Sequence, residues 1–552
     1  MQRNPAFKRP DIAYGVLIAA LSAAYYLVYL SSGYNFSDEG NFAQLCYELL
    51  LGRDPADLTI NYGILWFKAG EALFHVFGVE FVVVRLFFFT CIVITNVLIF
   101  YTVALATGSR PIGALAAIVP AVVPAFPPTA FYALCTMLNA AAQMRLAGSD
   151  AKFRHAAIAG AALSISFLIR PDFGYAFTLP LIAVLFLSSF AAAQEGRAAS
   201  PWTALRTPLL SAVAGFLVVQ AIAVSLAATG GYATVLLHQY FQYPAMMAQY
   251  LFGGLEQLFL PLDAATQEAG ALLRRPLVSD IFSGTTYEAL FAVLVYLPLV
   301  MLPGFAVLSA VTFLRGKGAS RVRELAQDLV VFSAAAVALP HYFFYRPDLS
   351  HVANFMPGYV ILLTVFVWRA YQRARRSGTS LRLALPVVGT VAAVNLLAFL
   401  WLGLSVPGTG SVAGHWSRTE HFQAGNGVEV RVNPGEAADL RFMRDFILKH
   451  SGPADRIVCL PYCPGIAFMA ERRMLFREFY VDDSTPLRQP HWIKEAIQAT
   501  RAARPSVVII MDWAINGTEK SRFSNWAAPY VGVLDQLADE SETRGIITAY
   551  AL

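Results

Sequence analysis

The sequence has few charged residues. Only 14% of its 552 residues are Asp, Glu, Lys or Arg, whereas soluble globular proteins average about a quarter. Hydrophobic residues make up 57% of the chain, and they gather in runs of about 18 to 25 residues, which is long enough to cross a bilayer as a helix. The shortage of charge therefore excludes an ordinary soluble protein and predicts a polytopic membrane protein.

Cysteine is also scarce, with five residues in the chain. Three of them lie in or beside apolar runs and are expected to be small buried hydrophobic residues. Cys459 and Cys463 flank Pro461 in CLPYC. A disulfide between them is allowed in an oxidising compartment, but it requires a tight bend that brings their Cα atoms within about 7 Å. No His cluster accompanies the pair, so zinc is not expected there.

Eleven apolar runs are the predicted membrane spans. Lys and Arg crowd alternate loops, including the N-terminus and residues 315–323 and 369–382. Because Lys and Arg are enriched on the cytoplasmic side, the N-terminus is expected in the cytoplasm and the C-terminus outside. The predicted spans are 12–31, 81–105, 111–126, 129–147, 155–170, 174–191, 208–228, 288–314, 328–345, 351–369 and 383–405.

Two domains are expected. Residues 1–405 form a transmembrane catalytic domain with large outer loops at 32–80 and 230–287. In the first loop, LCYELLLGRDP and ILWFKAGEALFHVFG are predicted amphipathic helices at the membrane surface.

Residues 406–552 have more charge and shorter apolar runs. DRIVCLPY and PSVVIIMDW indicate buried strands, while GEAADLRFMRDFILKH and HWIKEAIQATRAA indicate helices. The predicted fold class is a polytopic α-helical membrane protein with a small extracytoplasmic C-terminal α/β domain.

Ionisable side chains gather at the outer ends of the predicted spans. Such residues are costly beside a membrane unless they are paired or hydrated, so they are candidates for function. Two adjacent acids provide a general base or a site for a divalent cation, and Arg or His binds phosphate. The mixture indicates group transfer from a lipid phosphate to a hydroxyl. The candidates are Asp38 and Glu39 in NFSDEGNF, Lys68, Arg170 and Asp172 in IRPDFGY, and Arg346, Asp348 and His351 in RPDLSH.

This layout resembles the C-type (GT-C) membrane glycosyltransferases. The chain is most similar to the bacterial relatives of the protein O-mannosyltransferases and of the aminoarabinose transferase that modifies lipid A. The resemblance implies inverting transfer of a sugar from a polyprenyl-phosphate donor, with the first-loop acid Asp38, beside Glu39, as catalytic base or metal contact. RPDLSH resembles an Arg-x-Asp-x-x-His pattern of these relatives, which implies that Arg346 and His351 contact the donor phosphate. PYCPGIAFMAERR, residues 461–473, resembles a segment of their outer domain.

The expected reaction is transfer to a glycan, lipid or protein hydroxyl at the outer face of a bacterial cytoplasmic membrane. Lys68 and Arg170 are further candidates for donor-phosphate binding, and Asp172 and Asp348 are candidate supporting residues. A divalent cation, Mg, Mn or Ca, is an optional cofactor at Asp38 and Glu39. Membrane lipids are expected partners and nucleic acid is not.

Other interpretations stay open. The chain is alternatively a ligase or polymerase of lipid-linked glycans, or a transporter or flippase, although transporters place charges near the midplane and often show repeats. At single residues, Asp38 alternatively caps a helix that starts near Gly40, and Lys68 forms an ordinary helical pair with Glu71. Arg170 and Asp172 alternatively pair around Pro171, and Arg346, Asp348 and His351 alternatively form a loop network.

Overall fold

The structure is a computed structural model. It describes residues 9–60, 62–122, 127–149, 152–242, 278–337, 349–377, 412–515 and 519–552, with a few isolated positions between 338 and 401.

The described residues form two compact units. The helical unit contains residues up to Val28, those from Phe89 to 242 and those from 278 to Val412. The α/β unit combines Tyr29–Phe88 with Ala413–Leu552. The units therefore divide the chain differently from the two expected domains, because the first outer loop packs with the C-terminal segment.

Helices occupy ten of the eleven predicted spans, and the eleventh, 383–405, lies almost entirely outside the described residues. Among the described helices, α1, α4, α8, α9 and α13 are long and apolar enough to cross a membrane. The others are shorter or more polar, so the expected count of eleven spans stays a prediction. The helices are α1 (Arg9–Val28), α4 (Phe81–Thr107), α5 (Arg110–Val122), α6 (Ala130–Gly148), α7 (Lys152–Ile169), α8 (Pro171–Gln194), α9 (Pro201–Thr229), α13 (Thr286–Arg315), α14 (Ala319–Ala336) and α15 (Leu349–Ser377).

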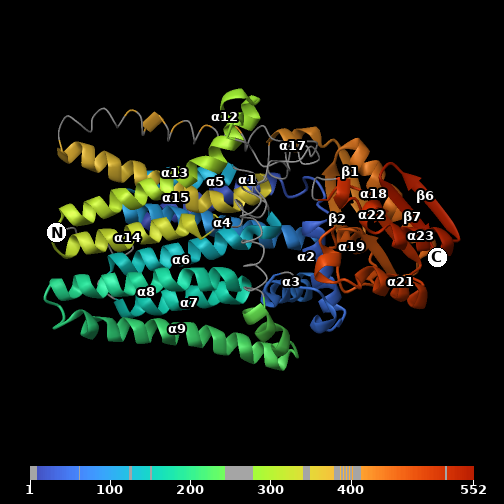
Figure 1. Cartoon of the computed structure of the whole chain (residues 1–552), viewed down its shortest axis with the longest axis horizontal. Coiled ribbons are helices and arrows are strands. Elements are labelled where there is room, and N and C mark those ends of the chain that lie inside the picture. Colours follow the sequence, from blue (N-terminus) through green and yellow to red (C-terminus); the bar gives the residue numbers. More distant parts are fainter. Residues whose placement is uncertain are drawn as a thin grey trace. The chain divides into compact units, whose positions relative to one another are not determined.

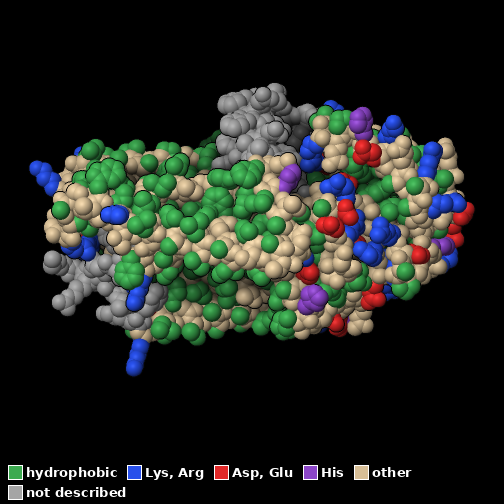
Figure 2. All heavy atoms as spheres, turned by 90° about the horizontal axis from the view of Figure 1, so that it is seen from below, with side chains coloured by type: hydrophobic (Ala, Val, Ile, Leu, Met, Phe, Trp, Pro, Cys, Tyr) green, Lys and Arg blue, Asp and Glu red, His purple; other side chains and the backbone are tan. Residues whose placement is uncertain are grey.

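Small residues allow helices of this unit to pack closely. A Cβ added to Gly160 of α7 would lie 1.9 Å from the Ala212 carbonyl oxygen of α9, and one added to Gly215 would lie 2.1 Å from the Ala157 oxygen. Such contacts are typical of helices that associate in lipid. On the face drawn in Figure 2, hydrophobic side chains cover the helical unit. This surface fits a bilayer environment.

The α/β unit contains a five-stranded mixed sheet in the order β4-β3-β5-β7-β6. Figure 1 labels its strands β6 and β7 near the C-terminus. The strands β3 (Arg456–Leu460), β4 (Arg473–Met474) and β5 (Val507–Met511) are parallel, and the hairpin of β6 (Glu540–Arg544) and β7 (Ile547–Ala551) continues the sheet in antiparallel fashion. β5 is buried along its whole length, as expected for an apolar run inside a sheet.

The two strands and two helices expected in this region are confirmed. They are β3, β5, α18 (Pro434–His450) and α21 (Trp492–Ala503). The helices expected in the first outer loop are α2 (Asp38–Leu50) and α3 (Ile64–Phe77). The remaining elements of the unit include the hairpin of β1 (Glu420–Ala424) and β2 (Val428–Val432), the short helices α19 (Pro464–Met469) and α20 (Thr485–Arg488), and α23 (Ala528–Leu537).

Candidate functional site

Asn35 organises the turn that begins α2. Its side-chain oxygen accepts hydrogen bonds from the backbone N–H groups of Ser37 (3.1 Å) and Asp38 (2.8 Å). Its carbonyl oxygen accepts from the N–H of Gly40 at 2.9 Å. Asp38 is therefore the first residue of α2 rather than the cap of a helix that begins near Gly40. A carboxylate in the first turn is favoured by the helix dipole.

Two glycines hold this turn against α19. A Cβ added to Gly40 would lie 2.4 Å from the Gly465 Cα, and one added to Gly465 would lie 2.7 Å from the Phe36 Cα. The Gly465 N–H donates to the Phe36 carbonyl oxygen at 2.8 Å, and the Tyr34 hydroxyl donates to the Gly465 carbonyl oxygen at 2.5 Å. Only residues without a side chain allow two backbones to approach so closely. The start of α2 is thus fixed to the segment that carries Tyr462.

Tyr462 contacts the candidate base directly. Its hydroxyl donates to Asp38 Oδ1 at 2.9 Å, and its carbonyl oxygen accepts from the Ser37 hydroxyl at 2.8 Å. Burial, followed by the negative charge of Asp38, raises the pKa of Tyr462 well above its usual value. The phenol therefore stays protonated near neutral pH and serves as the donor. The hydrogen bond orients the half-buried Asp38 carboxylate through its Oδ1.

The loop around Tyr462 is held from two sides. Cys459 and Cys463, between which the sequence allowed a disulfide, do form one, and their Cα atoms lie 5.4 Å apart. The Tyr480 ring packs edge-on against the Tyr462 ring, with 4.8 Å between centroids. The Tyr480 hydroxyl donates to Asp482 Oδ2 at 2.7 Å. Tyr462 is thus positioned by both covalent and aromatic contacts.

Glu39 has a different environment from Asp38. It is 1% exposed, and its Oε2 accepts a hydrogen bond from Arg85 Nη2 at 2.8 Å. Arg85, also fully buried, donates to the carbonyl oxygens of Leu30 and Gly33 as well. Two buried charges that pair with each other avoid the large cost of burying either one alone. The adjacent acids are therefore not equivalent, because Glu39 anchors the loop whereas Asp38 is partly exposed.

Sequence reasoning did not include Arg85 or Tyr462 among the site residues. Arg85 did carry a signal, because an arginine within the predicted span 81–105 must find a partner. Tyr462 lies in the segment 461–473, whose resemblance to the outer domain of the relatives marked the segment but gave the tyrosine no role.

The other candidate phosphate-binding residues have partners or lie outside the described structure. Lys68 pairs with Glu71 at 2.7 Å on α3. Arg170 belongs to the helical unit, where it is 1% exposed, pairs with Asp172 at 2.7 Å and lies 4.4 Å from the centroid of the Tyr132 ring. The pair lies at the start of α8, on both sides of Pro171. This agrees with the alternative in which Arg170 and Asp172 pair around the proline.

The RPDLSH segment is largely undescribed. Arg346 and Asp348 lie outside the described residues, and the backbone of His351 belongs to α15 but its side chain is not described. Their role in donor-phosphate binding stays a prediction.

The described residues do not offer a ready metal site. Among them, no group of three or more His, Cys, Asp or Glu side chains could hold a metal ion. Glu39 Oε2 is already bound by Arg85, so an ion at the acid pair would compete with this contact. The expected divalent cation stays a prediction, and no step below depends on it.

Comparison with known proteins identifies the fold. No family model matches the chain, and no curated protein matches its sequence. Among solved structures, it is similar to ArnT from Cupriavidus metallidurans bound to undecaprenyl phosphate, with a TM-score of 0.50 and 13% identity over 97% of each chain. It is also similar to the oligosaccharyltransferase AglB from Archaeoglobus fulgidus in complex with an inhibitory peptide and a dolichol-phosphate, with a TM-score of 0.50 and 13% identity over 91% of this chain and 69% of that one.

Both solved structures are C-type glycosyltransferases, so the chain has the C-type glycosyltransferase fold. The resemblance inferred from the sequence is confirmed at this level.

Proposed function

We propose that the chain is a membrane glycosyltransferase that moves a sugar from a polyprenyl-phosphate donor to an acceptor hydroxyl, with Asp38 as the general base. The fold supports the general class, because both similar structures contain a polyprenyl or dolichol phosphate lipid. The observation that carries the proposal is the environment of Asp38. It is a half-buried carboxylate that begins a helix, with one oxygen held by Tyr462.

The proposed step is a displacement at the anomeric carbon of the donor sugar. Asp38 accepts the proton of the acceptor hydroxyl, and the hydroxyl oxygen attacks the anomeric carbon of the donor sugar. The bond between that carbon and the phosphate oxygen breaks, and its electron pair leaves with the lipid phosphate. The transition state has oxocarbenium character, as in other glycosyl transfers. Attack from the side opposite the leaving phosphate inverts the anomeric configuration.

The two neighbouring acids have separate roles in this proposal. Asp38 performs the proton transfer. Glu39 keeps Arg85 neutralised and holds the loop that presents Asp38, so it is a positioning residue. Arg346 and His351 are proposed to contact the leaving phosphate, where cationic groups would stabilise the negative charge that develops. We propose that the reaction takes place at the outer face of a bacterial cytoplasmic membrane.

Asp38→Asn tests the proposal. The amide keeps the size of the side chain and accepts the Tyr462 hydrogen bond, but it cannot take a proton. We expect sugar transfer from labelled polyprenyl-phosphate sugars to native membrane acceptors to fall by about 10² to 10⁴, the usual contribution of a general base. Donor binding should be unchanged.

The matched control is Asp539→Asn, because Asp539 is an exposed carboxylate of the same unit that directly precedes β6 rather than beginning α2. This variant should transfer sugar at the wild-type rate when the folded amounts are equal. Normal transfer by Asp38→Asn would contradict the role of Asp38. If the wild-type protein transferred no sugar from any polyprenyl-phosphate donor, the proposed function itself would be wrong.

A further inference from the structure

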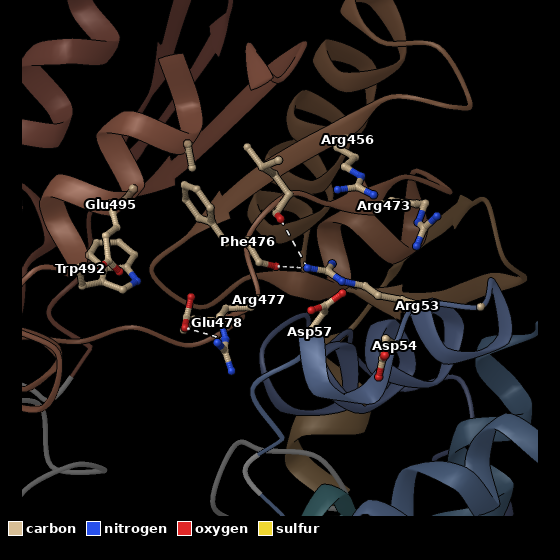
Figure 3. A pocket seen from close by; sticks show the side chains of 14 residues that line it. Arg53, Asp54, Asp57, Arg456, Arg473, Phe476, Arg477, Glu478, Trp492 and Glu495 are labelled. Carbon is tan, nitrogen blue, oxygen red and sulfur yellow. Dashed lines mark hydrogen bonds and ion pairs between the residues drawn. The ribbon is translucent and has the colours of Figure 1, made fainter. Parts of the chain in front are cut away.

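The α/β unit contains a cavity of about 670 Å³. Its walls come from the loop after α2, from β3 and β4, and from α21 (Figure 3). This volume is within the range of small-molecule binding sites. None of its lining residues belongs to the contact between Asp38 and Tyr462. It is therefore a candidate for a second ligand-binding region in the same unit.

Three arginines gather at one side of the cavity, as Figure 3 shows for Arg53, Arg456 and Arg473. Arg456 and Arg473 are direct partners in the register of the parallel strands β3 and β4. Like charges placed opposite each other on neighbouring strands normally destabilise a sheet. The sequence nevertheless places both at the edge of the cavity, which indicates a use for the combined charge.

The protein itself compensates only part of this charge. Glu48, which is fully buried, pairs with Arg473 at 3.1 Å and lies 3.7 Å from Arg53. Arg53 also donates to the carbonyl oxygens of Met474 and Phe476. Burial lowers the pKa of Arg53; Glu48 opposes this effect, and the neighbouring Arg456 and Arg473 add to it. Asp54 and Asp57 also line the cavity, and the charge of Asp57, like that of Glu48, raises the pKa of Arg53. Among the described residues, the arginine of this wall without an acidic partner is Arg456.

Arg456 provides the accessible part of this charge. Its side chain is exposed, and within the described part of the chain it forms no hydrogen bond or ion pair. Arg473 is 28% exposed in its side chain. Two accessible guanidinium groups, side by side, match the oxygens of a phosphate or carboxylate, since each group offers parallel N–H donors.

The opposite side of the cavity has a different chemistry. Trp492 and Glu495 of α21 lie there, away from Arg53, Arg456 and Arg473 (Figure 3). A fourth lining arginine, Arg477, pairs with Glu478 at 3.4 Å. Phe476 and Glu478 also line the cavity. Carboxylates accept hydrogen bonds from sugar hydroxyls. The aromatic side chains of Phe476 and Trp492, which line the cavity, suit the C–H face of a sugar ring. The cavity thus combines a cationic end with an end that suits a polyhydroxylated body.

We propose that this cavity binds an anionic saccharide, with its phosphate or carboxylate at Arg456 and Arg473 and its hydroxyls toward Glu478 and Glu495. Its assignment as the acceptor glycan rests on the proposed function. The binding itself does not depend on it. When the two proposals are taken together, the α/β unit selects acceptors that carry negative charge, and Asp38 deprotonates the hydroxyl that is glycosylated.

The test is a ligand-observed NMR titration of the full-length protein in detergent. The probes are glucose 6-phosphate, glucuronate, glucose and inorganic phosphate. We expect one or both anionic sugars to bind more tightly than glucose and than inorganic phosphate, and we expect binding to weaken as salt is added. The comparison of glucose 6-phosphate with glucuronate distinguishes a phosphate from a carboxylate ligand.

Arg456→Ala removes the unpaired guanidinium from an exposed position, so the variant is expected to fold. It should weaken binding of the anionic sugar by about tenfold or more, the usual effect of losing a hydrogen bond to a charged group. Arg501→Ala is the control, because Arg501 is an exposed arginine of α21 that does not line the cavity. It should bind as the wild type does.

Equal binding by the two variants would overturn the proposal. Equal affinity for glucose and glucose 6-phosphate would overturn the role of the arginines, and equal affinity for inorganic phosphate would overturn the preference for a saccharide. The same titration with Asp38→Asn separates the two proposals, because this variant should bind the anionic sugar normally even if the chain transfers no sugar.

Discussion

Asp38 and Glu39 are adjacent in the sequence but have opposite surroundings. Glu39 is enclosed with Arg85 at a distance of 2.8 Å, whereas Asp38 is half-buried and contacts a neutral phenol. A buried carboxylate that pairs with a buried cation is fixed in place, which suits a positioning role. A partly exposed carboxylate beside a neutral donor is not paired with that donor as an ion, which suits proton transfer. The environment therefore assigns the general-base role to Asp38 in the proposed mechanism.

Tyr462→Phe should slow sugar transfer by about tenfold, because it removes the hydrogen bond that orients Asp38 while keeping the ring packed against Tyr480. The rate of transfer, measured with equal folded amounts, gives this effect directly. Tyr550→Phe is a matched control, since Tyr550 donates to Asp535 at 3.1 Å elsewhere in the same unit. A similar loss in both variants would mean that Tyr462 acts through general stability rather than through Asp38.

At the scale of elements, the first turn of α2 and the start of α19 act together. They meet at Gly40 and Gly465, where no Cβ fits. This contact places the N-terminus of α2 beside the Tyr462 loop and defines where the candidate base lies. Helix propensity alone would favour alanine at Gly40, so the glycine reflects this packing.

Gly40→Ala should therefore lower the stability of the α/β unit by about 1–3 kcal/mol, the usual cost of overpacking, and reduce transfer. Gly532→Ala in α23 is the opposite case, because a Cβ there meets no atom within 4 Å. It should leave stability unchanged or raise it by about 0.4–1 kcal/mol. Thermal unfolding of both variants measures the difference. A Gly40→Ala protein as stable as Gly532→Ala would refute the close packing.

The sequence contains a hairpin signal that hydropathy does not record. The β1–β2 hairpin turns at Asn426 and Gly427, both with positive φ, and Asn-Gly between short strands is a strong hairpin signal. The strand β6, ESETR, is mostly exposed and has no apolar alternation. Only its pairing with β7 defines it, so hydropathy gave no indication of it.

At the scale of the whole molecule, the proposed reaction requires the α/β unit to lie outside the cytoplasm. A cysteine introduced at Leu487, which is 83% exposed, should react with a membrane-impermeant maleimide in intact spheroplasts. A cysteine at the exposed Lys317, in a loop expected in the cytoplasm, should react only after permeabilisation. The native free cysteines are buried and should contribute little background. The reverse labelling pattern would contradict the proposed topology.

The sequence by itself determined the local properties of this protein. Apolar runs placed the helices, buried strands such as β5 appeared as short apolar segments, and an acid pair after the first span indicated a site. Each of these depends on residues that are close together in the chain. The tertiary structure decided which of the two acids is held by Arg85 and which by Tyr462, a residue 424 positions from Asp38. It also placed Arg456 beside Arg473, because hydropathy records burial of a segment but not its partner across a sheet.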